Sequence, residues 1–404
     1  MHNVLTEELQ QGMVLARNLF NDRGDTLLAK GITLTEQYVE SLQQRGFRMV
    51  YVRDGIADDV DPPELLSPKV RALTQKHLGE LFSIGRKVAT SVQEGKLQEE
   101  EALEQFASAA KPCFVHLYQD VQRIVQEVAG TPVISGIVSL KSHDNYTFEH
   151  SMEVAVTAVV LGERLRLRST ELEQLALGCL CHDLGKLTVP RGILNKPGTL
   201  TSDEFGLMRE HPQASYQIAQ RLMTPGDIIA RNLVRQHHER QDGHGYPRGL
   251  RGTNHLPMGR PAYGQTLILP AAEIAAVADV YSAVSSDRPY RRAMDPPEVA
   301  ATLRKMAGTH LNREIVSRLL SILPTYPVGT EVVVVSGKLE GYSGIVTDVD
   351  PYHVNHPIVR ILFDSRGHAV APIEVDTRKE KGVELAVSPL PRPREVATVR
   401  AGRW

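Results

Sequence analysis

The sequence contains little cysteine and few aromatic residues. Its three cysteines are Cys113, Cys179 and Cys181. A set this sparse, with an odd number of members, argues against a disulfide framework and fits a reducing compartment. The opening residues, MHNVLTEELQQG, carry acidic side chains and lack the basic flank and apolar run of a signal peptide. We therefore expect a cytoplasmic protein.

Long apolar runs and an excess of one charge are also missing. The longest apolar stretch, residues 267–284, is interrupted by Pro270, Glu273 and Asp279, whereas a membrane-spanning helix needs about 20 apolar residues in succession. The 46 Lys and Arg residues nearly balance the 48 Asp and Glu residues, so the formal net charge is −2. We therefore expect neither membrane insertion nor binding of a nucleic-acid polymer, and any anion-binding site must be local.

The remaining composition, 42% hydrophobic and 23% charged, is that of a globular protein. At about 100–200 residues per domain, a chain of 404 residues holds two to four domains. Shifts in composition divide it into a small α+β module at 1–56, a linker at 57–67, a helical connector at 68–129, a mainly helical domain at 130–324, a β-rich module at 325–388 and a flexible basic tail at 389–404.

Local signals support this division. In the first module, MVLARNLF reads as one strand, and a helix is expected from Thr35 to Arg45, with Thr33 and Glu36 at capping-box spacing. After the linker, Ser67 is the expected N-cap and Pro68 the first helical residue. The Val- and Ile-rich runs TEVVVVSG, GYSGIVTDV and HPIVRILFD, separated by turn residues, predict a β module with the turn pattern of an SH3-like barrel.

The first candidate for chemistry is the pair His182-Asp183, which follows the apolar segment LEQLALGCLC. A helix ending at Gly185 would present both side chains at its C-terminal end. The imidazole and one carboxylate oxygen could bind one metal ion while the second oxygen reaches another. The alternative is an ordinary salt bridge at a helix end.

Further histidines occur at comparable positions. His237 and His238 lie on a predicted helix that leads into the loop 240–250, whose glycines allow the backbone to approach a ligand closely. His150 opens a helical, largely apolar segment, and His211 stands at another helix start. Taken alone, a histidine such as His150 or His211 is more often structural, and a histidine pair on a surface helix is usually solvated.

One aspartate gives a stronger signal. Asp279 interrupts the apolar helix EIAAVADVYSAV. An unpaired carboxylate buried there would cost several kcal/mol, on the order of what a lost buried ion-pair partner costs. Asp279 therefore needs a cation.

These segments together resemble the HD-GYP family of cyclic di-GMP phosphodiesterases, a branch of the HD metal-hydrolase superfamily. The resemblance covers residues 135–324, about half of the chain. Its motifs are YTFEHS at 146–151, HDLGK at 182–186, MREHP at 208–212, HHERQDGHGYPRGL at 237–250, VADV at 277–280 and DRPYRRA at 287–293. The resemblance implies a mainly α protein, in which an all-helical HD-type catalytic domain lies between the small α+β module and the small β module.

The resemblance also implies a buried metal centre. One divalent ion would take His150, His182, Asp183 and Asp279, and the other would take His211, His237 and His238, with Asp183 shared as a bridge. It favours iron or manganese, and imidazole and carboxylate ligands also suit zinc. Many members of the family carry an acidic residue for a third metal at the position of Tyr146, so we expect two ions here.

The implied reaction is hydrolysis of cyclic di-GMP to linear pGpG, with a further step to GMP left open. A hydroxide bridging the two ions, held through His182 and Asp183, would attack phosphorus in line with the departing ribose oxygen. We assign Lys186 to stabilise the phosphoryl oxygens or the leaving group; its alternative is an ordinary surface lysine. Arg288 and Arg291 would bind phosphate oxygens in bidentate fashion.

The loop Gly245-Tyr246-Pro247 has three interpretations: it shapes the active-site entrance and binds substrate, it docks a diguanylate cyclase (GGDEF) domain, or it is only a rigid turn. The chain also departs from the family pattern. Ser282 replaces the second acid of the usual Asp-x-x-Asp, and the stretch 252–272 is longer than usual. That stretch is either a lid that restricts access to the site or an insertion with no role there.

Two alternatives to cyclic di-GMP hydrolysis stay open. One is an HD-family hydrolase that acts on another cyclic dinucleotide or a nucleotide phosphate. The other is a receptor that binds cyclic di-GMP and metal with little or no turnover and signals through its flanking modules. The N-terminal module resembles a small domain often found ahead of HD-GYP domains, which makes it a candidate for signal input or homodimerisation.

Overall fold

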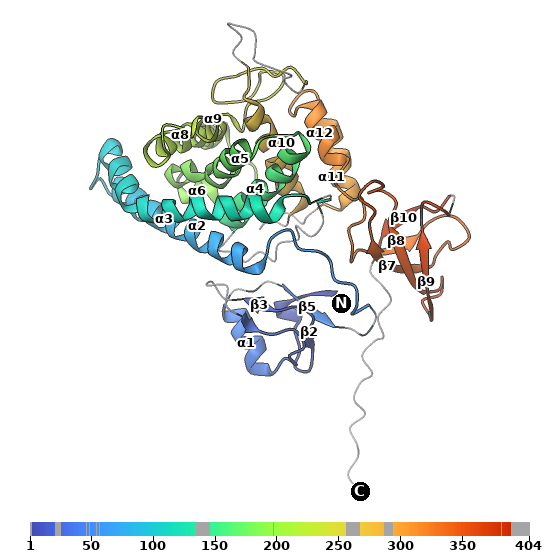
Figure 1. Ribbon diagram of the computed structural model, residues 1–404. Helices are drawn as coiled ribbons and strands as arrows, with labels where there is room; N and C mark the ends of the chain where they lie inside the picture. The colour runs from blue at the N-terminus through green and yellow to red at the C-terminus, as the bar shows by residue number, and fades with distance from the viewer. Residues whose placement is uncertain are drawn as a thin grey trace. The chain divides into compact units, whose positions relative to one another are not determined.

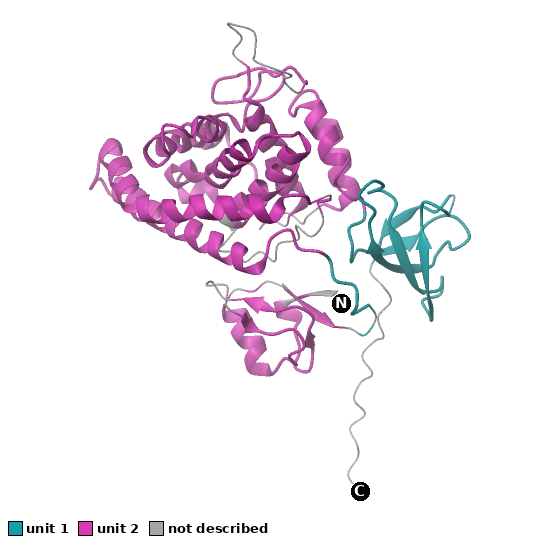
Figure 2. Cartoon of the chain, in the orientation of Figure 1, with its two compact units in different colours: residues 1, 54–62, 326–404 teal, residues 2–53, 63–325 magenta. Residues whose placement is uncertain are grey.

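The computed structural model describes residues 2–20, 26–45, 47, 49–53, 55, 57–131, 133–134, 146–196, 198–255, 267–286, 294–380 and 382–388. The chain forms two compact units (Figure 2). One comprises residues 2–53 and 63–325, and the other comprises residues 1, 54–62 and 326–404.

The N-terminal module is a small α+β fold. Its antiparallel sheet has the order β1 (His2–Leu5), β5 (Met49–Arg53), β2 (Val14–Leu15), beside a hairpin of β3 (Leu19–Phe20) and β4 (Thr26–Leu28). The expected single strand MVLARNLF is therefore wrong, because it is divided between β2 and β3. Helix α1 (Glu36–Gln44) is capped by the side chain of Thr35, which accepts a hydrogen bond from Tyr38 N at 3.3 Å, and not by Thr33.

Two long helices follow and lie side by side (Figure 1). They are α2 (Pro68–Gln93) and α3 (Glu99–Val128). Ser67 is the N-cap of α2 and Pro68 its first residue, which confirms that prediction. On α3, the apolar positions Leu117, Val121, Ile124 and Val128 are buried, so this stripe packs against neighbouring helices.

In the described part of the helical domain, the elements are α4 (Tyr146–Arg164), α5 (Ser169–Cys181), the 3-10 turn η3 (Leu184–Thr188), α6 (Arg191–Leu194), α7 (Ser202–Met208), α8 (His211–Leu222), α9 (Ile228–Gln236), α10 (Pro270–Ser285), α11 (Pro296–Met306) and α12 (Arg313–Leu320). Helices α4, α5 and α10 are apolar on most sides and form the centre of its core. A Cβ on Gly178 would lie 3.2 Å from Ala230 Cα, so the missing side chain lets α9 pack tightly on α5.

The second unit is built on a five-stranded antiparallel sheet. Its order is β10 (Leu385–Val387), β6 (Glu331–Val334), β7 (Ser343–Asp348), β8 (Ile358–Phe363), β9 (Ala369–Asp376). Among the strands described, β10 and β9 are the two edges, so the expected SH3-like barrel is not closed. Ala57 and Val60, from the segment predicted as a linker, pack against Ile345, Leu362 and Phe363 in this core.

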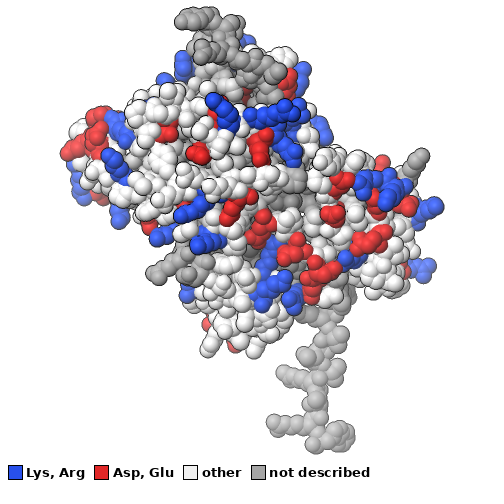
Figure 3. Space-filling model, viewed as in Figure 1, with Lys and Arg blue, Asp and Glu red and all other residues white. Residues whose placement is uncertain are grey.

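The surface charges and the polarity of the helices are those expected from a chain with balanced charge and no long apolar run. Figure 3 shows basic and acidic side chains intermixed on the face in view, without a large patch of one sign. Over the described part of the chain, no helix combines the length and the apolar character needed to cross a bilayer.

Candidate metal centre

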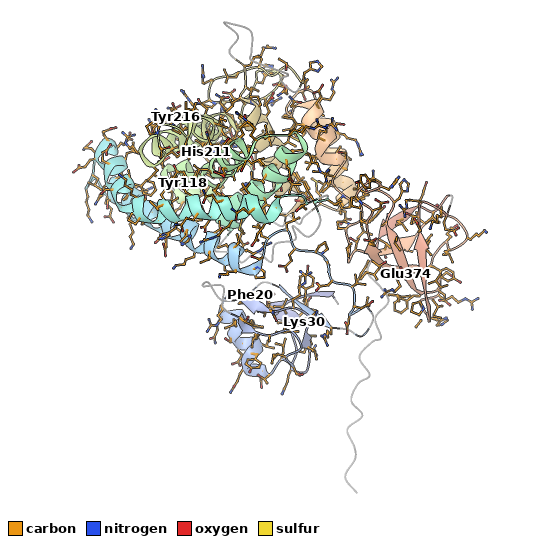
Figure 4. The ribbon with its side chains drawn as sticks, viewed as in Figure 1. Phe20, Lys30, Tyr118, His211, Tyr216 and Glu374 are labelled. Carbon is orange, nitrogen blue, oxygen red and sulfur yellow. The ribbon has the colours of Figure 1, made fainter. Side chains whose placement is uncertain are left out.

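The seven residues that the motifs single out as metal ligands come together inside the helical domain. His150 lies on α4, His182 and Asp183 follow α5, His211 begins α8, His237 and His238 follow α9, and Asp279 lies in the middle of α10. His211, labelled in Figure 4, is 1% exposed and lies within the helical domain. The sequence placed the end of α5 at Gly185; the helix in fact ends at Cys181, and the turn η3 carries Lys186.

Two groups of donor atoms form within this cluster. His150, His182 and Asp183 make one group and His211, His237 and His238 the other, and the donor atoms within each group lie within 4.8 Å of one another. Asp183 connects the groups, because its Oδ2 lies 3.3 Å from His182 Nε2 and its Oδ1 lies 3.4 Å from His211 Nε2.

The remaining distances complete the cluster. Asp279 Oδ1 lies 3.0 Å from His150 Nε2. The Nε2 atoms of His211 and His237 are 3.3 Å apart. Nitrogen and oxygen donors therefore converge from several helices on one buried region.

Main-chain carbonyl groups orient three of these histidines. The Nδ1–H groups donate to the carbonyl oxygen three residues earlier: His182 to Cys179 at 2.7 Å, His211 to Met208 at 2.7 Å and His237 to Val234 at 2.8 Å. A carbonyl oxygen can only accept, so Nδ1 carries a proton in each of them, and the neutral form of the ring presents the Nε2 lone pair to the centre. This is the tautomer that ligates metals through Nε2.

His150 is oriented differently. Its Nδ1 lies 3.0 Å from Ser282 Oγ, and the Ser282 hydroxyl donates to Glu153 Oε2 at 2.7 Å. Ser286 donates to the same carboxylate oxygen at 3.1 Å. The chain thus links His150 to a buried acid through a serine hydroxyl.

Burial and neighbouring charges set the ionisation of the cluster. Burial lowers the pKa of His237 well below its usual value, that of His211 to about 3 and that of His238 to about 4. Burial opposes ionisation of Asp183, but His182 and Lys186 outweigh it and hold the pKa of the carboxyl well below its ordinary range. Neutral imidazoles beside an ionised carboxylate are the forms that bind a divalent cation.

The donor set fits a bound cation. Asp183 Oδ1 is fully buried and accepts no hydrogen bond from the part of the chain that the structure describes. A buried carboxylate oxygen in this state is costly unless a cation compensates it. The Asp279 carboxylate lies 3.0 Å from His150 Nε2 through its Oδ1.

Lys186 lies at the edge of the centre. Its Nζ is 2.6 Å from Asp183 Oδ2, and its side chain is 26% exposed. The Lys186 ammonium group therefore neutralises the Asp183 carboxylate and remains accessible from solvent. The position suits contact with an anionic ligand that enters beside Asp183.

The loop after α9 holds an aromatic ring against the cluster. A Cβ on Gly245 would collide with Arg240 N and lie 2.5 Å from Glu239 Cα, so only glycine fits. Next to it, Tyr246 N donates to His238 O at 3.1 Å, and the two rings have centroids 4.9 Å apart. Pro247 is exposed. Gly245 therefore has a structural role that places Tyr246 over His238.

The Glu239 carboxylate fixes the rest of that loop. It accepts hydrogen bonds from Arg248 N and Leu250 N, both at 2.8 Å. Glu239 is 3% exposed. Glu239, the acid of the His-His-Glu sequence, thus stabilises the loop through these hydrogen bonds and is not one of the clustered metal donors.

Sequence reasoning missed two residues near the centre. The Arg209 guanidinium lies 5.1 Å from the centroid of the Tyr246 ring and 5.9 Å from that of Phe205. Its position two residues before His211 was the available signal. Glu153 was also not assigned, because nothing in the sequence shows that it meets Ser282, 129 residues away.

Other predicted positions lie outside the described residues. These are Arg288 and Arg291, the side chain of Tyr146, and residues 256–266 of the long stretch 252–272. The described remainder of that stretch is anchored, since Asn254 N donates to Gln241 Oε1 at 2.9 Å.

Comparison with known proteins places these features in a family context. Residues 133–315 match the HD domain family. A cyclic di-GMP phosphodiesterase of Pseudomonas aeruginosa is 31% identical over 284 residues, which cover 66% of this chain and 64% of the relative. The 3'3'-cGAMP-specific phosphodiesterase 1 of Vibrio cholerae is 35% identical, covering 45% of this chain and 38% of the relative.

A third relative is the cyclic di-GMP phosphodiesterase response regulator of Xanthomonas campestris pv. campestris. It is 32% identical over 186 residues, which cover 45% of each chain. The chain thus spans less than two thirds of the length of each of these three relatives.

Proposed function

Residues 133–315 match the HD domain family, and from this premise we propose that the chain is a metal-dependent phosphodiesterase of the HD-GYP type that hydrolyses cyclic di-GMP. The observation that carries the proposal is the position of Asp183, whose two oxygens face two separate imidazole groups at 3.3 and 3.4 Å. Such an arrangement suits a pair of cations on either side of one carboxylate.

The proposed centre uses all seven clustered residues. His150, His182, Asp183 and Asp279 would hold one divalent ion, and His211, His237 and His238 the other, with Asp183 shared. We favour iron or manganese, with zinc as the alternative. When bound, such ions lower the pKa of water and neutralise charge on a phosphoryl group.

The side chains around the centre have separate tasks in this proposal. Lys186, next to Asp183, would stabilise negative charge on the phosphoryl oxygens or the departing ribose oxygen. Tyr246 and Arg209 would contact the part of the substrate that lies outside the metal centre. Addition of water breaks one phosphodiester bond and yields linear pGpG. Further hydrolysis to GMP, docking of a GGDEF domain and homodimerisation stay predictions.

The second candidate substrate is 3'3'-cGAMP. The relative of Vibrio cholerae that is named for this substrate is 35% identical to the chain over 181 residues. The two substrates share the phosphodiester ring and differ in one base, so the same centre could hydrolyse either. Base contacts outside the centre would decide between them.

Product analysis tests the proposal. Protein loaded anaerobically with iron or manganese is incubated with cyclic di-GMP or 3'3'-cGAMP, and the products are separated by chromatography. We expect pGpG from the wild type and from His116→Ala, an exposed histidine on α3, and none from His182→Ala or Asp183→Ala.

Three results would change the conclusion. Faster cleavage of 3'3'-cGAMP would favour the second candidate. Tight binding of cyclic di-GMP without product, with metal present, would favour a receptor. Full activity of Asp183→Ala would contradict the assignment of the centre.

A further inference from the structure

The two halves of the centre differ in what orients their histidines. His182, His211 and His237 each donate Nδ1–H to a main-chain carbonyl. His150 instead meets a serine hydroxyl that is bonded to a buried carboxylate. We propose that Glu153 is a positioning residue, which acts through Ser282 to orient His150 and to strengthen the bond of that histidine to one of two metal ions. This inference rests on the metal centre of the proposed function.

The connecting groups are all buried. Glu153 is 3% exposed, Ser282 1% and Ser286 8%. Ser282 and Ser286 lie one turn apart, the second directly after α10, and both donate to the same oxygen, Glu153 Oε2. Excluded from water, these hydrogen bonds are stronger and more directional than on the surface.

The direction of the protons follows from the chemistry of each group. A carboxylate oxygen only accepts, so the Ser282 hydroxyl donates to Glu153. Its lone pair is then the acceptor for Nδ1–H of His150. Nε2 of His150 consequently faces the centre, where it lies 3.0 Å from Asp279 Oδ1. A negative group behind an imidazole also makes Nε2 a better electron donor to a cation.

The consequence is an asymmetric centre. The ion held by His150, His182, Asp183 and Asp279 gains from the carboxylate behind His150. Among the described residues, His211 and His237 have main-chain carbonyl groups behind them in place of a carboxylate. Loss of the Glu153 charge should therefore weaken one of the two bound ions and leave the other nearly unchanged.

Direct metal titration tests this. Metal-free full-length protein is titrated with Mn²⁺ against a fluorescent chelator, which reports the affinity of each bound equivalent without any substrate. We expect Glu153→Gln and Ser282→Ala to weaken one equivalent by about 10- to 100-fold, the usual effect of losing an outer partner of a metal-binding histidine. Ser286→Ala should have a smaller effect, because Ser282 still connects Glu153 to His150.

The same helices provide matched controls. Glu163, also on α4, accepts from Gly130 N at 2.9 Å, and Ser285, also on α10, donates to Tyr281 O at 2.7 Å. Glu163→Gln and Ser285→Ala should bind both equivalents like the wild type. The double variant Glu153→Gln/Ser282→Ala should bind Mn²⁺ as tightly as whichever single variant has the lower affinity, because both changes break the same connection.

Three outcomes would overturn the inference. The first is that Glu153→Gln binds both equivalents as tightly as the wild type. The second is that Glu153→Gln weakens both equivalents equally and also lowers the unfolding temperature of the metal-free protein. The third is that the effects of the two single changes add in the double variant. The titration needs no substrate. A wild type that binds two Mn²⁺ unequally yet cleaves no cyclic dinucleotide would therefore contradict the proposed function and leave this inference standing.

Discussion

At the scale of single residues, the centre depends on charges that stabilise one another away from water. Asp183 is 1% exposed, and its ionisation is maintained by His182 and Lys186. Three imidazoles that burial keeps neutral surround the second half of the centre. Each group would be costly alone, so removal of one partner leaves an uncompensated charge or an unfilled site.

Lys186 provides the first prediction. Replacement of Lys186 by Met removes the cation 2.6 Å from Asp183 but none of the imidazole or carboxylate donors. We expect kcat for the proposed reaction to fall by about 100-fold, the usual cost of losing one charge-stabilising donor, while the metal content stays at the wild-type level. Steady-state kinetics with metal analysis checks this. Lys196→Met, whose lysine pairs with Glu204, is the control, and loss of metal from Lys186→Met would contradict the assignment.

The second prediction concerns Arg209. Its guanidinium lies 5.1 Å from the Tyr246 ring, outside the donor cluster, so Arg209→Ala should impair binding of a dinucleotide and not the chemical step. We expect KM for cyclic di-GMP to rise by about 2- to 30-fold, the range of a cation–π contact. Hydrolysis of bis(p-nitrophenyl) phosphate, which has no nucleobase, should be unchanged. Arg221→Ala, whose arginine pairs with Glu104 on the surface, should affect neither substrate; an equal loss on both substrates in Arg209→Ala would refute a binding role.

At the scale of secondary structure, helix ends place the ligands. His182 and His237 follow the C-terminal ends of α5 and α9, and His211 follows that of α7 by three residues. The last turn of each helix leaves main-chain carbonyls free to accept from Nδ1. Gly185 lets the segment that follows α5 pack closely against the start of α8. Its amide donates to Ser215 Oγ at 2.7 Å, and the same hydroxyl donates to His182 O at 2.7 Å.

Gly185→Ala tests this close packing. An added Cβ would collide with the His211 carbonyl oxygen and lie 2.5 Å from Ser215 N, and main-chain atoms cannot move aside without displacing His211. We expect a loss of about 1–3 kcal/mol in unfolding free energy, as for other overpacked sites, together with weaker metal binding. Gly192→Ala, where the Cβ meets nothing within 4 Å, should be neutral. Chemical denaturation and Mn²⁺ titration measure both effects, and wild-type values for Gly185→Ala would contradict the role of this glycine.

The motifs predicted the histidines and aspartates that cluster in the structure and the helical domain that holds them, because each motif is a short pattern of neighbouring residues. Contacts between segments far apart in the sequence leave no such local pattern and could not be predicted. Glu153 meets Ser282 only after α4 packs against α10. The division of MVLARNLF between two sheets and the packing of Ala57 and Val60 beneath β7 and β8 depend on tertiary contacts in the same way.

At the scale of the whole molecule, metal binding should stabilise one unit selectively. All the clustered donors belong to the unit of residues 2–53 and 63–325. A ligand that binds only the folded state adds about 2.7 kcal/mol at 100 times its Kd. With an unfolding entropy of about 2.1 cal/mol/K per residue, that raises the unfolding temperature of a unit of this size by about 4 °C.

Calorimetry with and without chelator checks this prediction. The transition of the helical unit should move to higher temperature with Mn²⁺ and return when the metal is removed. The transition of the β unit should not move, and Asp183→Asn should show no shift in either. A shift of equal size in Asp183→Asn would mean that Mn²⁺ binds elsewhere.

We propose above that two ions held by the clustered residues make the chain a cyclic di-GMP phosphodiesterase. The most direct measurement adds Mn²⁺ stepwise to metal-free protein and follows pGpG release against the number of ions bound per chain. We expect no pGpG without metal and full turnover only when both equivalents are filled. Turnover in the metal-free protein, or no pGpG with both equivalents filled, would contradict this proposal.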